Sequence, residues 1–192
     1  HHGICAKFML LTGARITETT AATWSQIDLE AMTWTIPPEN LKDTRALQAR
    51  RHKPKQALAI PLSRQAIQLL TDTREAETER RQLNGLQEEI RKQDLLFVGP
   101  RGSKLGNWDR WLKATTATTG ITGWSAHALR RTTATLAGDL GAPPHIVSVM
   151  LGHSNVGGQL VAGYNHSTYG FEHRQILQEL SNKLKDFPLY TS

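Results

Sequence analysis

The chain has 192 residues, 39% of them hydrophobic, and a formal net charge of +6 at pH 7, which suits one domain with a sizeable core. Its single cysteine, Cys5, excludes an internal disulfide framework and a zinc site with several cysteine ligands, and it fits the reducing cytoplasm. No apolar run approaches the roughly 18 residues that a membrane helix needs, so we expect no membrane-spanning segment.

Two short helices are predicted at the start of the chain. Residues 4–11 have a helical apolar pattern, and Gly13 is the kind of residue that follows a helix C-terminus. Thr17 is a typical N-cap residue and is expected to begin the second helix, which runs to about Trp24. Arg15 is therefore expected in the connection between the two helices.

A β-hairpin with a basic connection is predicted next. Residues 32–36 have strand character and end at Pro37, and residues 57–62 are expected to return as the partner strand. Between them, residues 42–55 contain six Lys or Arg and one Asp, a local charge of +5. A loop that tracks the phosphates of nucleic acid needs such a concentration of cations. The balanced charges of residues 63–94 indicate only a solvated helix face.

Helices are predicted over most of the remaining chain. Ser63 is expected to cap a helix that continues through a charged stretch to an interruption at Asn84 and Gly85. Asn107 is expected to begin another helix. Its stripe at helical spacing is interpreted as core rather than as a base-stacking platform, and consists of Trp108, Trp111, Leu112 and Thr115.

Three more helices are predicted towards the C-terminus. The first is capped by Ser125 and ends near Asp139, the second begins at Pro144 and stops at Gly152, and the third begins at Phe171. The third carries an apolar stripe that is expected to pack on the chain's own core or on a neighbouring subunit: Ile176, Leu177, Leu180 and Leu184. Together the elements predict a mainly α-helical domain with a small antiparallel β-sheet.

Two side chains of the helix after Ser125 are predicted to face one ligand. Positions three apart share a helix face, so His127 and Arg130 converge, whereas Arg131 is expected to face solvent. His127 lies in the first turn, where unpaired backbone N–H groups and the helix dipole favour an anion such as phosphate. Arg130 is therefore the candidate functional cation.

Four short motifs occur together in a recognisable order. They are TGARITE at residues 12–18, HALRRT at 127–132, LGHSN at 151–155, and a tyrosine soon after, Tyr164. The combination resembles the C-terminal catalytic domain of tyrosine recombinases of the phage integrase family, and the resemblance covers nearly the whole chain. The stretches WTIPPENLK, IPLSRQA and YNHSTYGFEHR resemble the prophage-type branch in particular.

The resemblance implies the integrase catalytic fold and a DNA-cleaving site of six residues. By motif these are Arg15, Lys42, His127, Arg130, His153 and Tyr164. The implied nucleophile is Tyr164, the implied general acid is Lys42, and the two arginines hold the phosphate oxygens. The histidines are expected to assist proton transfer or to donate a hydrogen bond to the phosphate. Glu18, one turn beyond Arg15, is expected to orient that arginine.

The implied activity is site-specific recombination through a 3′-phosphotyrosine intermediate. Because that bond conserves the energy of the DNA strand, no ATP or other cofactor is expected. No metal is expected either, because the two arginines replace the usual cationic clamp. The implied partner is double-stranded DNA, which the basic loop also contacts through Arg45, Arg50, Arg51, Lys53 and Lys55. We expect a tetramer on DNA, a monomer in its absence, and a location in the cytoplasm at the nucleoid.

The family places a helical DNA-clamping domain before its catalytic domain. Residues 1–192 are therefore expected to be the catalytic domain of a longer protein, with that N-terminal domain absent. Without it, we expect weak DNA binding, surviving strand cleavage and no full recombination.

Two of the implied roles have alternatives in the sequence. Lys53 and Lys55 are substitutes for Lys42 as the general acid, because they lie in the same basic loop. Tyr164 lies eleven residues after the histidine of the LGHSN motif, a longer spacing than is common in the family. Tyr169 is therefore an alternative nucleophile.

Two other functions are alternatives to the recombinase. A DNA-binding protein without catalysis would use the basic loop and the helix starts only for phosphate contacts. A histidine-based metal hydrolase would act on phosphodiesters, but the sequence has no His-Glu-x-x-His spacing and no paired carboxylates near its histidines. His145, His166 and His173 are interpreted as structural or phosphate-contacting residues.

Overall fold

The structure is a computed structural model that describes residues 1–41, 56–86, 88–99, 102–152 and 169–185. In chain order its elements are α1 (His2–Thr12), α2 (Ile16–Thr20), η1 (Trp24–Gln26), β1 (Ile27–Asp28), β2 (Thr33–Ile36), η2 (Pro38–Asn40), β3 (Leu58–Pro61), α4 (Arg64–Leu83), α5 (Trp108–Thr119), α6 (Ala126–Asp139), α7 (Pro144–Met150) and α9 (Gly170–Lys185). The predicted class, mainly helical with a small antiparallel sheet, is confirmed. No helix in the described part of the chain is long and apolar enough to cross a membrane.

The sheet has three strands in the order β1-β2-β3, all antiparallel. The predicted hairpin is confirmed, with Trp34 opposite Ile60 and Ile36 opposite Leu58. Trp34 and Ile36 are fully buried, which fixes the face of β2 that turns to the core. The third strand, β1, was not predicted, because two residues are too few to show alternation.

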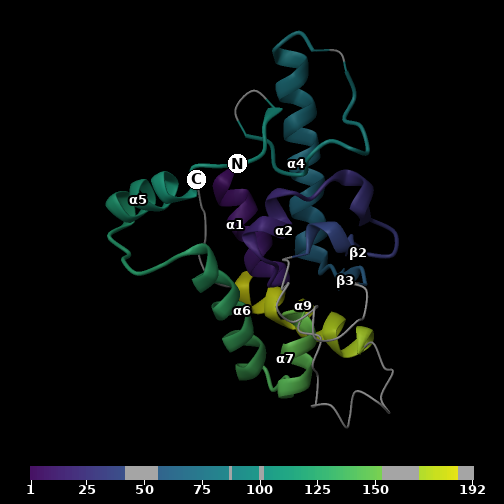
Figure 1. Cartoon of the computed structure of the whole chain (residues 1–192), viewed down its shortest axis with the longest axis vertical. Helices are drawn as coiled ribbons and strands as arrows, with labels where there is room; N and C mark the ends of the chain where they lie inside the picture. Colours follow the sequence, from purple (N-terminus) through teal and green to yellow (C-terminus); the bar gives the residue numbers. More distant parts are fainter. Residues whose placement is uncertain (42–55, 87, 100–101, 153–168, 186–192) are drawn as a thin grey trace.

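Helix α1 is the central element of the fold. It packs against α2, α4, α6 and α9, and Figure 1 shows it between α4 and α6. Residues on several sides of it are buried, among them Cys5, Phe8 and Met9, as expected for a helix surrounded by others. It ends at Gly13, whose φ of 68° is the left-handed conformation that glycine adopts without strain.

The second helix starts earlier than predicted. Arg15, not Thr17, is its N-cap residue, and α2 runs only from Ile16 to Thr20. The reason is the carboxylate of Glu18, which accepts a hydrogen bond from the Arg15 backbone N–H at 2.8 Å. That carboxylate replaces the hydroxyl cap that the sequence suggested.

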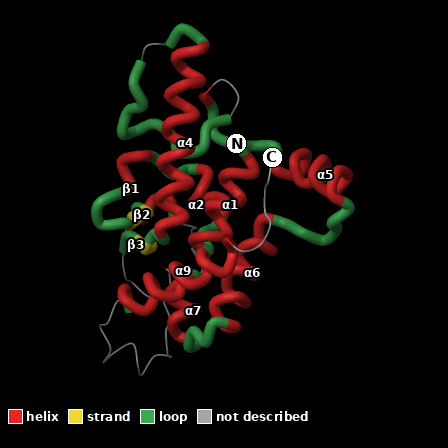
Figure 2. Tube along the Cα trace, turned by 180° about the vertical axis from the view of Figure 1, so that it is seen from behind, coloured by secondary structure: helices red, strands yellow, loops and turns green. Residues whose placement is uncertain are grey.

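The C-terminal end of α4 and helix α5 project from the rest of the molecule, as Figures 1 and 2 show from opposite sides. Ser63 caps α4 as predicted, and the helix ends just before Asn84. Helix α5 follows Asn107, also as predicted, but none of its residues is fully buried. Of the stripe interpreted as core, Trp108 packs on the core, while Trp111 lies in an edge-to-face contact with Trp124.

The last three helices form the lower half of Figure 1 and match their predicted extents. The stripe of α9 covers the chain's own core, with Leu177 and Leu180 fully buried. A polar seam on the same helix reinforces this packing: Ser181 donates to the Ser63 hydroxyl at 2.7 Å, and the Gln178 side-chain oxygen accepts from the Arg64 backbone N–H at 3.0 Å. Of the two predicted positions for α9, the structure adopts the intramolecular one.

Candidate active site

Arg15 is held by one carboxylate at two points. Its Nη1 donates to Glu18 Oε1 at 2.8 Å, while its backbone N–H donates to the other carboxylate oxygen, also at 2.8 Å. The Glu18 side chain is fully buried, whereas 28% of the Arg15 side chain is exposed. The predicted contact between Glu18 and Arg15 is therefore present, and it leaves part of the guanidinium accessible to an outside group.

Arg130 is buried where three helix ends meet. Its Nη1 donates to the carbonyl oxygen of Gly13 at 2.6 Å, at the end of α1. Its Nη2 donates to the carbonyl oxygen of Leu151, just beyond α7. Only 7% of the residue is exposed. A guanidinium carries five N–H donors, so these two bonds fix its plane and leave further donors for a ligand.

The two guanidiniums lie within electrostatic range of each other. Burial, and then the positive charge of Arg15, lower the pKa of Arg130 to about 10, while the charge of Glu18 raises it. Arg130 is still protonated at pH 7. The site therefore combines two arginine charges with the single carboxylate of Glu18, and an added anion would lower the electrostatic energy of the pair.

His127 lies one turn before Arg130 and is exposed. The Ser125 hydroxyl caps this end of α6 by accepting from the Ala128 N–H at 3.1 Å. Arg131 is exposed, which confirms the expectation that it faces solvent. The start of α6 therefore presents an exposed histidine one turn before the buried arginine, at a helix end that favours anions.

Thr133 ties the arginine helix to the central helix. Its hydroxyl lies 2.9 Å from the Leu10 carbonyl of α1 and 3.1 Å from the Leu129 carbonyl of its own helix. Its methyl group faces Gly13, where an added Cβ would lie 3.2 Å from it. Sequence reasoning missed this residue, although its position three after Arg130 places it on the same helix face.

Eight of the predicted site residues lie outside the described residues. They are Lys42, Arg45, Arg50, Arg51, Lys53, Lys55, His153 and Tyr164. The alternative nucleophile Tyr169 is described: it is half-buried, and its ring centroid lies 5.0 Å from that of His145. His173 is 2% exposed, so its side chain is part of the interior rather than a surface for phosphate.

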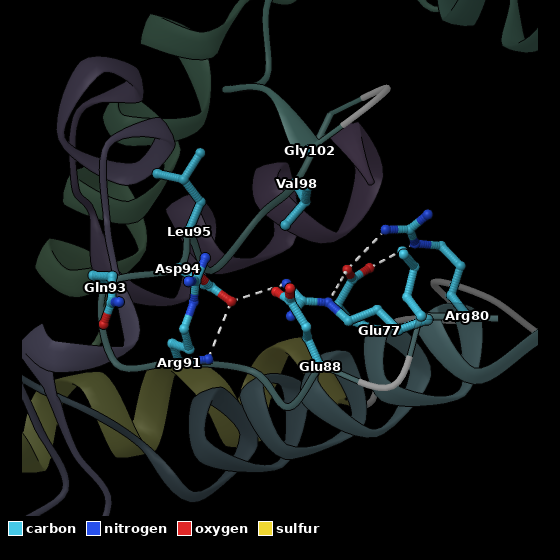
Figure 3. A pocket seen from close by; sticks show the side chains of 11 residues that line it. Glu77, Arg80, Glu88, Arg91, Gln93, Asp94, Leu95, Val98 and Gly102 are labelled. Carbon is cyan, nitrogen blue, oxygen red and sulfur yellow. Dashed lines mark hydrogen bonds and ion pairs between the residues drawn. The ribbon is translucent and has the colours of Figure 1, made fainter. Parts of the chain in front are cut away.

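A cavity of about 560 Å³ lies between the C-terminal half of α4 and residues 86–98 (Figure 3), and neither Arg15 nor Arg130 lines it. Four of its charged lining residues form a connected network of ion pairs. Glu77 accepts from Arg80 at 2.7 Å and from Arg81 at 3.0 Å, and Arg81 also donates to Asp94 at 2.9 Å. The hydrogen bonds from Arg80, together with those of Arg81, hold the pKa of Glu77 below its usual value. These charges fix the segment after α4 to the helix.

The described residues offer neither a reactive thiol nor a cluster of metal ligands. Burial raises the pKa of the Cys5 thiol to about 12, so a thiolate nucleophile is excluded at neutral pH. No group of three or more His, Cys, Asp or Glu side chains in the described part of the chain is placed to hold a metal ion.

The comparison with protein families decides the identity of the domain. The profile described as "Phage integrase family" matches residues 1–170, which include the arginine pair and the helices that hold it. The chain belongs to the phage integrase family. The resemblance inferred from the four motifs is thereby confirmed.

Solved structures of integrases show the same fold. The Tn1549 transposon integrase, in complex with transposon right end DNA, aligns with a TM-score of 0.58 and 19% identity over 96% of this chain and 58% of that chain. The integrase of mycobacterium phage Brujita gives a TM-score of 0.56 and 17% identity over 98% of this chain and 54% of that chain. XerA recombinase gives a TM-score of 0.53 and 18% identity over 95% and 57%. No curated protein matches the chain.

These alignments set the scope of the comparison. The chain spans little more than half the length of the integrases that it matches. At such identities, the likeness establishes the mainly helical catalytic-domain fold with its three-stranded sheet. The roles of individual residues rest instead on the geometry of this chain.

Proposed function

We propose that this domain is a site-specific DNA recombinase that cleaves and rejoins DNA strands through a 3′-phosphotyrosine, without ATP or metal. One observation carries the proposal: the Arg130 guanidinium donates to the carbonyl oxygen of Gly13, two residues before Arg15, so two arginines 115 positions apart in the sequence lie at the same helix end. Two guanidiniums in one place can bind both non-bridging oxygens of a single phosphate. Membership of the integrase family supports the same reading.

In the proposed reaction, Tyr164 is the nucleophile. A tyrosine hydroxyl has a pKa near 10, so its attack on phosphorus needs help with the loss of its proton. His127 and His153 assist that transfer or donate a hydrogen bond to the phosphate. The new bond joins the phenolic oxygen to phosphorus while the bond from phosphorus to the 5′ oxygen breaks. Lys42 gives the departing 5′ oxygen its proton.

Arg15 and Arg130 stabilise the charge that develops on the non-bridging oxygens during this displacement. Reversal of the same chemistry, with a 5′-hydroxyl from a partner strand, rejoins the DNA and frees Tyr164. Atoms and charge balance without a co-reactant, because the phosphotyrosine keeps the energy of the original phosphodiester bond. The exposed part of Arg15 and the free donors of Arg130 are the groups that contact the phosphate first.

The proposed partner is double-stranded DNA. The basic segment 42–55 adds sequence-independent phosphate contacts through Arg45, Arg50, Arg51, Lys53 and Lys55. Recombination joins two sites, so we propose four subunits on DNA and a monomer in its absence. Residues 1–192 form the catalytic domain, which cleaves strands alone in the cytoplasm and needs a further DNA-clamping domain for complete exchange.

The experiment that tests this proposal is capture of the covalent adduct. The chain is incubated with a pool of nicked duplexes of randomised sequence, in which cleavage releases a short fragment and traps the phosphotyrosine. Adducts that survive denaturation are sequenced, and the modified residue is identified by mass spectrometry. Modification of Tyr164, lost in Tyr164→Phe and retained with a metal chelator, supports the proposal.

Each other outcome has a defined meaning. Modification of Tyr169, lost in Tyr169→Phe, moves the nucleophile but keeps the reaction. Binding of the pool without any adduct identifies a DNA-binding protein without catalysis. Strand cleavage that a chelator abolishes identifies a metal hydrolase. Either of the last two results overturns the recombinase proposal.

A further inference from the structure

Gly152 lies directly against the first residue of β3. It follows α7 with a φ of 59°, and a Cβ added to it would lie 2.8 Å from Leu58 Cδ2. Such a distance is shorter than real Cβ contacts allow, so the two residues touch without space between them. Leu58 is half-buried, packs on the hydrophobic core and is held in register opposite Ile36. The Leu58 side chain, anchored in the sheet, therefore limits how far the end of α7 can move towards β3.

The peptide group beside this contact accepts a hydrogen bond from Arg130. Arg130 Nη2 donates to the carbonyl oxygen of Leu151, and that carbonyl belongs to the peptide bond between Leu151 and Gly152. Because a peptide group is planar and moves as a unit, a shift of Gly152 away from the sheet moves the acceptor of Arg130 with it. The Leu58 side chain thus sets the position of a hydrogen bond that it does not touch.

We propose that Leu58 is a positioning residue for the phosphate site: it seats Gly152, and through the Leu151 carbonyl it fixes the Arg130 guanidinium. This inference rests on the proposed function for its effect on DNA cleavage. Displacement of a catalytic group by an ångström costs up to about a hundredfold in rate, so a side chain remote from the reacting atoms has a measurable effect. Leu58 makes no contact with DNA in this proposal.

The test is a double-mutant cycle on Leu58 and Gly152, measured as the single-turnover rate of adduct formation per folded molecule. Leu58→Ala removes the contact with Gly152 and is expected to lower the rate roughly tenfold. Gly152→Ala drives a methyl group into Leu58 and also puts alanine at a φ of 59°, which is strained for it, so the rate is expected to fall roughly a hundredfold. In the double variant the clash is gone, so Leu58→Ala now raises the rate of Gly152→Ala by about tenfold. Leu58→Met keeps the contact and is expected to restore most of the activity.

A second measurement needs no catalysis. The Nε–Hε resonance of Arg130 in a ¹⁵N-edited NMR spectrum, assigned from its loss in Arg130→Lys, reports the environment of the guanidinium. Leu58→Ala is expected to move it. The matched control is Leu69→Ala, because Leu69 is also a half-buried leucine packed on the core but lies on α4. That control is expected to leave the resonance in place.

The outcomes separate this inference from the proposed function. If Leu58→Ala moves the Arg130 resonance no more than Leu69→Ala does, the positioning role is wrong, whatever the chain does to DNA. If Leu58→Ala slows the Gly152→Ala variant further instead of rescuing it, the role is also wrong. If the wild-type chain forms no adduct but the resonance moves as expected, the proposed function fails and the positioning of Arg130 stands.

Discussion

Two regions of this domain bring arginines and carboxylates together, and they differ in charge balance. At the end of α4, Arg80, Arg81 and Glu77 pair with one another, and Asp94 accepts from Arg81. At the meeting point of α1, α6 and α7, the Glu18 carboxylate pairs with Arg15, whereas Arg130 donates to neutral backbone carbonyls.

The difference separates a structural ion-pair network from the proposed phosphate site. In the α4 network, each charge has an opposite charge within hydrogen-bond distance, so an added anion gains little. In the arginine pair, the excess positive charge is partly buried and costs free energy until an anion arrives. Dashed lines in Figure 3 mark the interactions of Glu77 and Asp94 with arginines of the first region. Both regions have arginines at their centre, so residue type alone does not identify the ligand site.

The largest expected effect is that of Arg130→Lys. Lysine keeps the charge but loses the planar fork that bonds Gly13, Leu151 and a phosphate together. We expect the single-turnover rate of adduct formation to fall by about a hundred- to a thousandfold. The control is Arg131→Lys, an exposed neighbour on the same helix, which is expected to keep the wild-type rate. Equal effects of the two variants would contradict the assignment.

The next effect concerns a buried base that remains uncharged. Burial, and then the charge of Arg174, lower the pKa of His173 to about 4, whereas an unfolded histidine has a pKa near 6.5. The unfolded chain therefore binds a proton first as the pH falls. The free energy of unfolding is expected to decrease between pH 6.5 and pH 4, by about 3 kcal/mol in total from this residue.

Urea unfolding at several pH values measures this decrease. His173→Gln has no group that titrates in this range, so the difference between the two chains isolates the histidine from the carboxylates. The wild-type chain is expected to lose stability towards pH 4 more steeply than the variant. Parallel pH profiles would show that His173 is accessible to protons in the folded chain.

A smaller loss of stability is expected from Glu18→Gln. It removes the carboxylate that pairs with Arg15 and leaves the charges of the two arginines uncompensated, at a cost of about 2 kcal/mol. Inorganic phosphate is expected to recover part of that loss, because an anion replaces the missing charge. Thermal unfolding with and without phosphate measures both effects. Glu79→Gln, an exposed carboxylate on α4, serves as the control and is expected to show neither.

The smallest expected effect is that of Arg81→Met in the balanced network. Glu77 keeps Arg80 and Asp94 keeps Arg91, so we expect a loss of only about 1 kcal/mol in the free energy of unfolding. The adduct-formation rate per folded molecule is expected to stay unchanged, and added phosphate is expected to give no recovery. A phosphate-dependent recovery here would remove the distinction between the two regions.

The sequence predicted much of the fold because its signals are local. Ser63 and Ser125 as N-caps, Gly13 as a helix end and the hairpin of β2 and β3 each depend on a few neighbouring residues. The prediction of Thr17 as a cap was wrong because a local preference does not show which of two neighbouring residues begins the helix. The buried carboxylate of Glu18 accepts from the Arg15 backbone N–H and stabilises a helix start two residues earlier, which the cap propensity of Thr17 alone does not reveal.

The sequence predicted less of the site, because its key partners are backbone groups. Helical spacing and motif order identified Arg15 and Arg130, but the carbonyls of Gly13 and Leu151 have no sequence signature. The Gly13 carbonyl lies 117 positions from the arginine that it accepts from. The contact between Leu58 and Gly152 is likewise set by tertiary packing, so only coordinates reveal it.

The most direct test of the shared phosphate site is a titration of the folded chain with orthovanadate, a phosphate mimic, followed through the Nε–Hε NMR resonances of Arg15 and Arg130. A shared site predicts that both resonances shift along one binding curve with one midpoint, and that Glu18→Gln lowers that midpoint. Movement of one resonance without the other, or two separate midpoints, would show that the two guanidiniums do not hold the same anion.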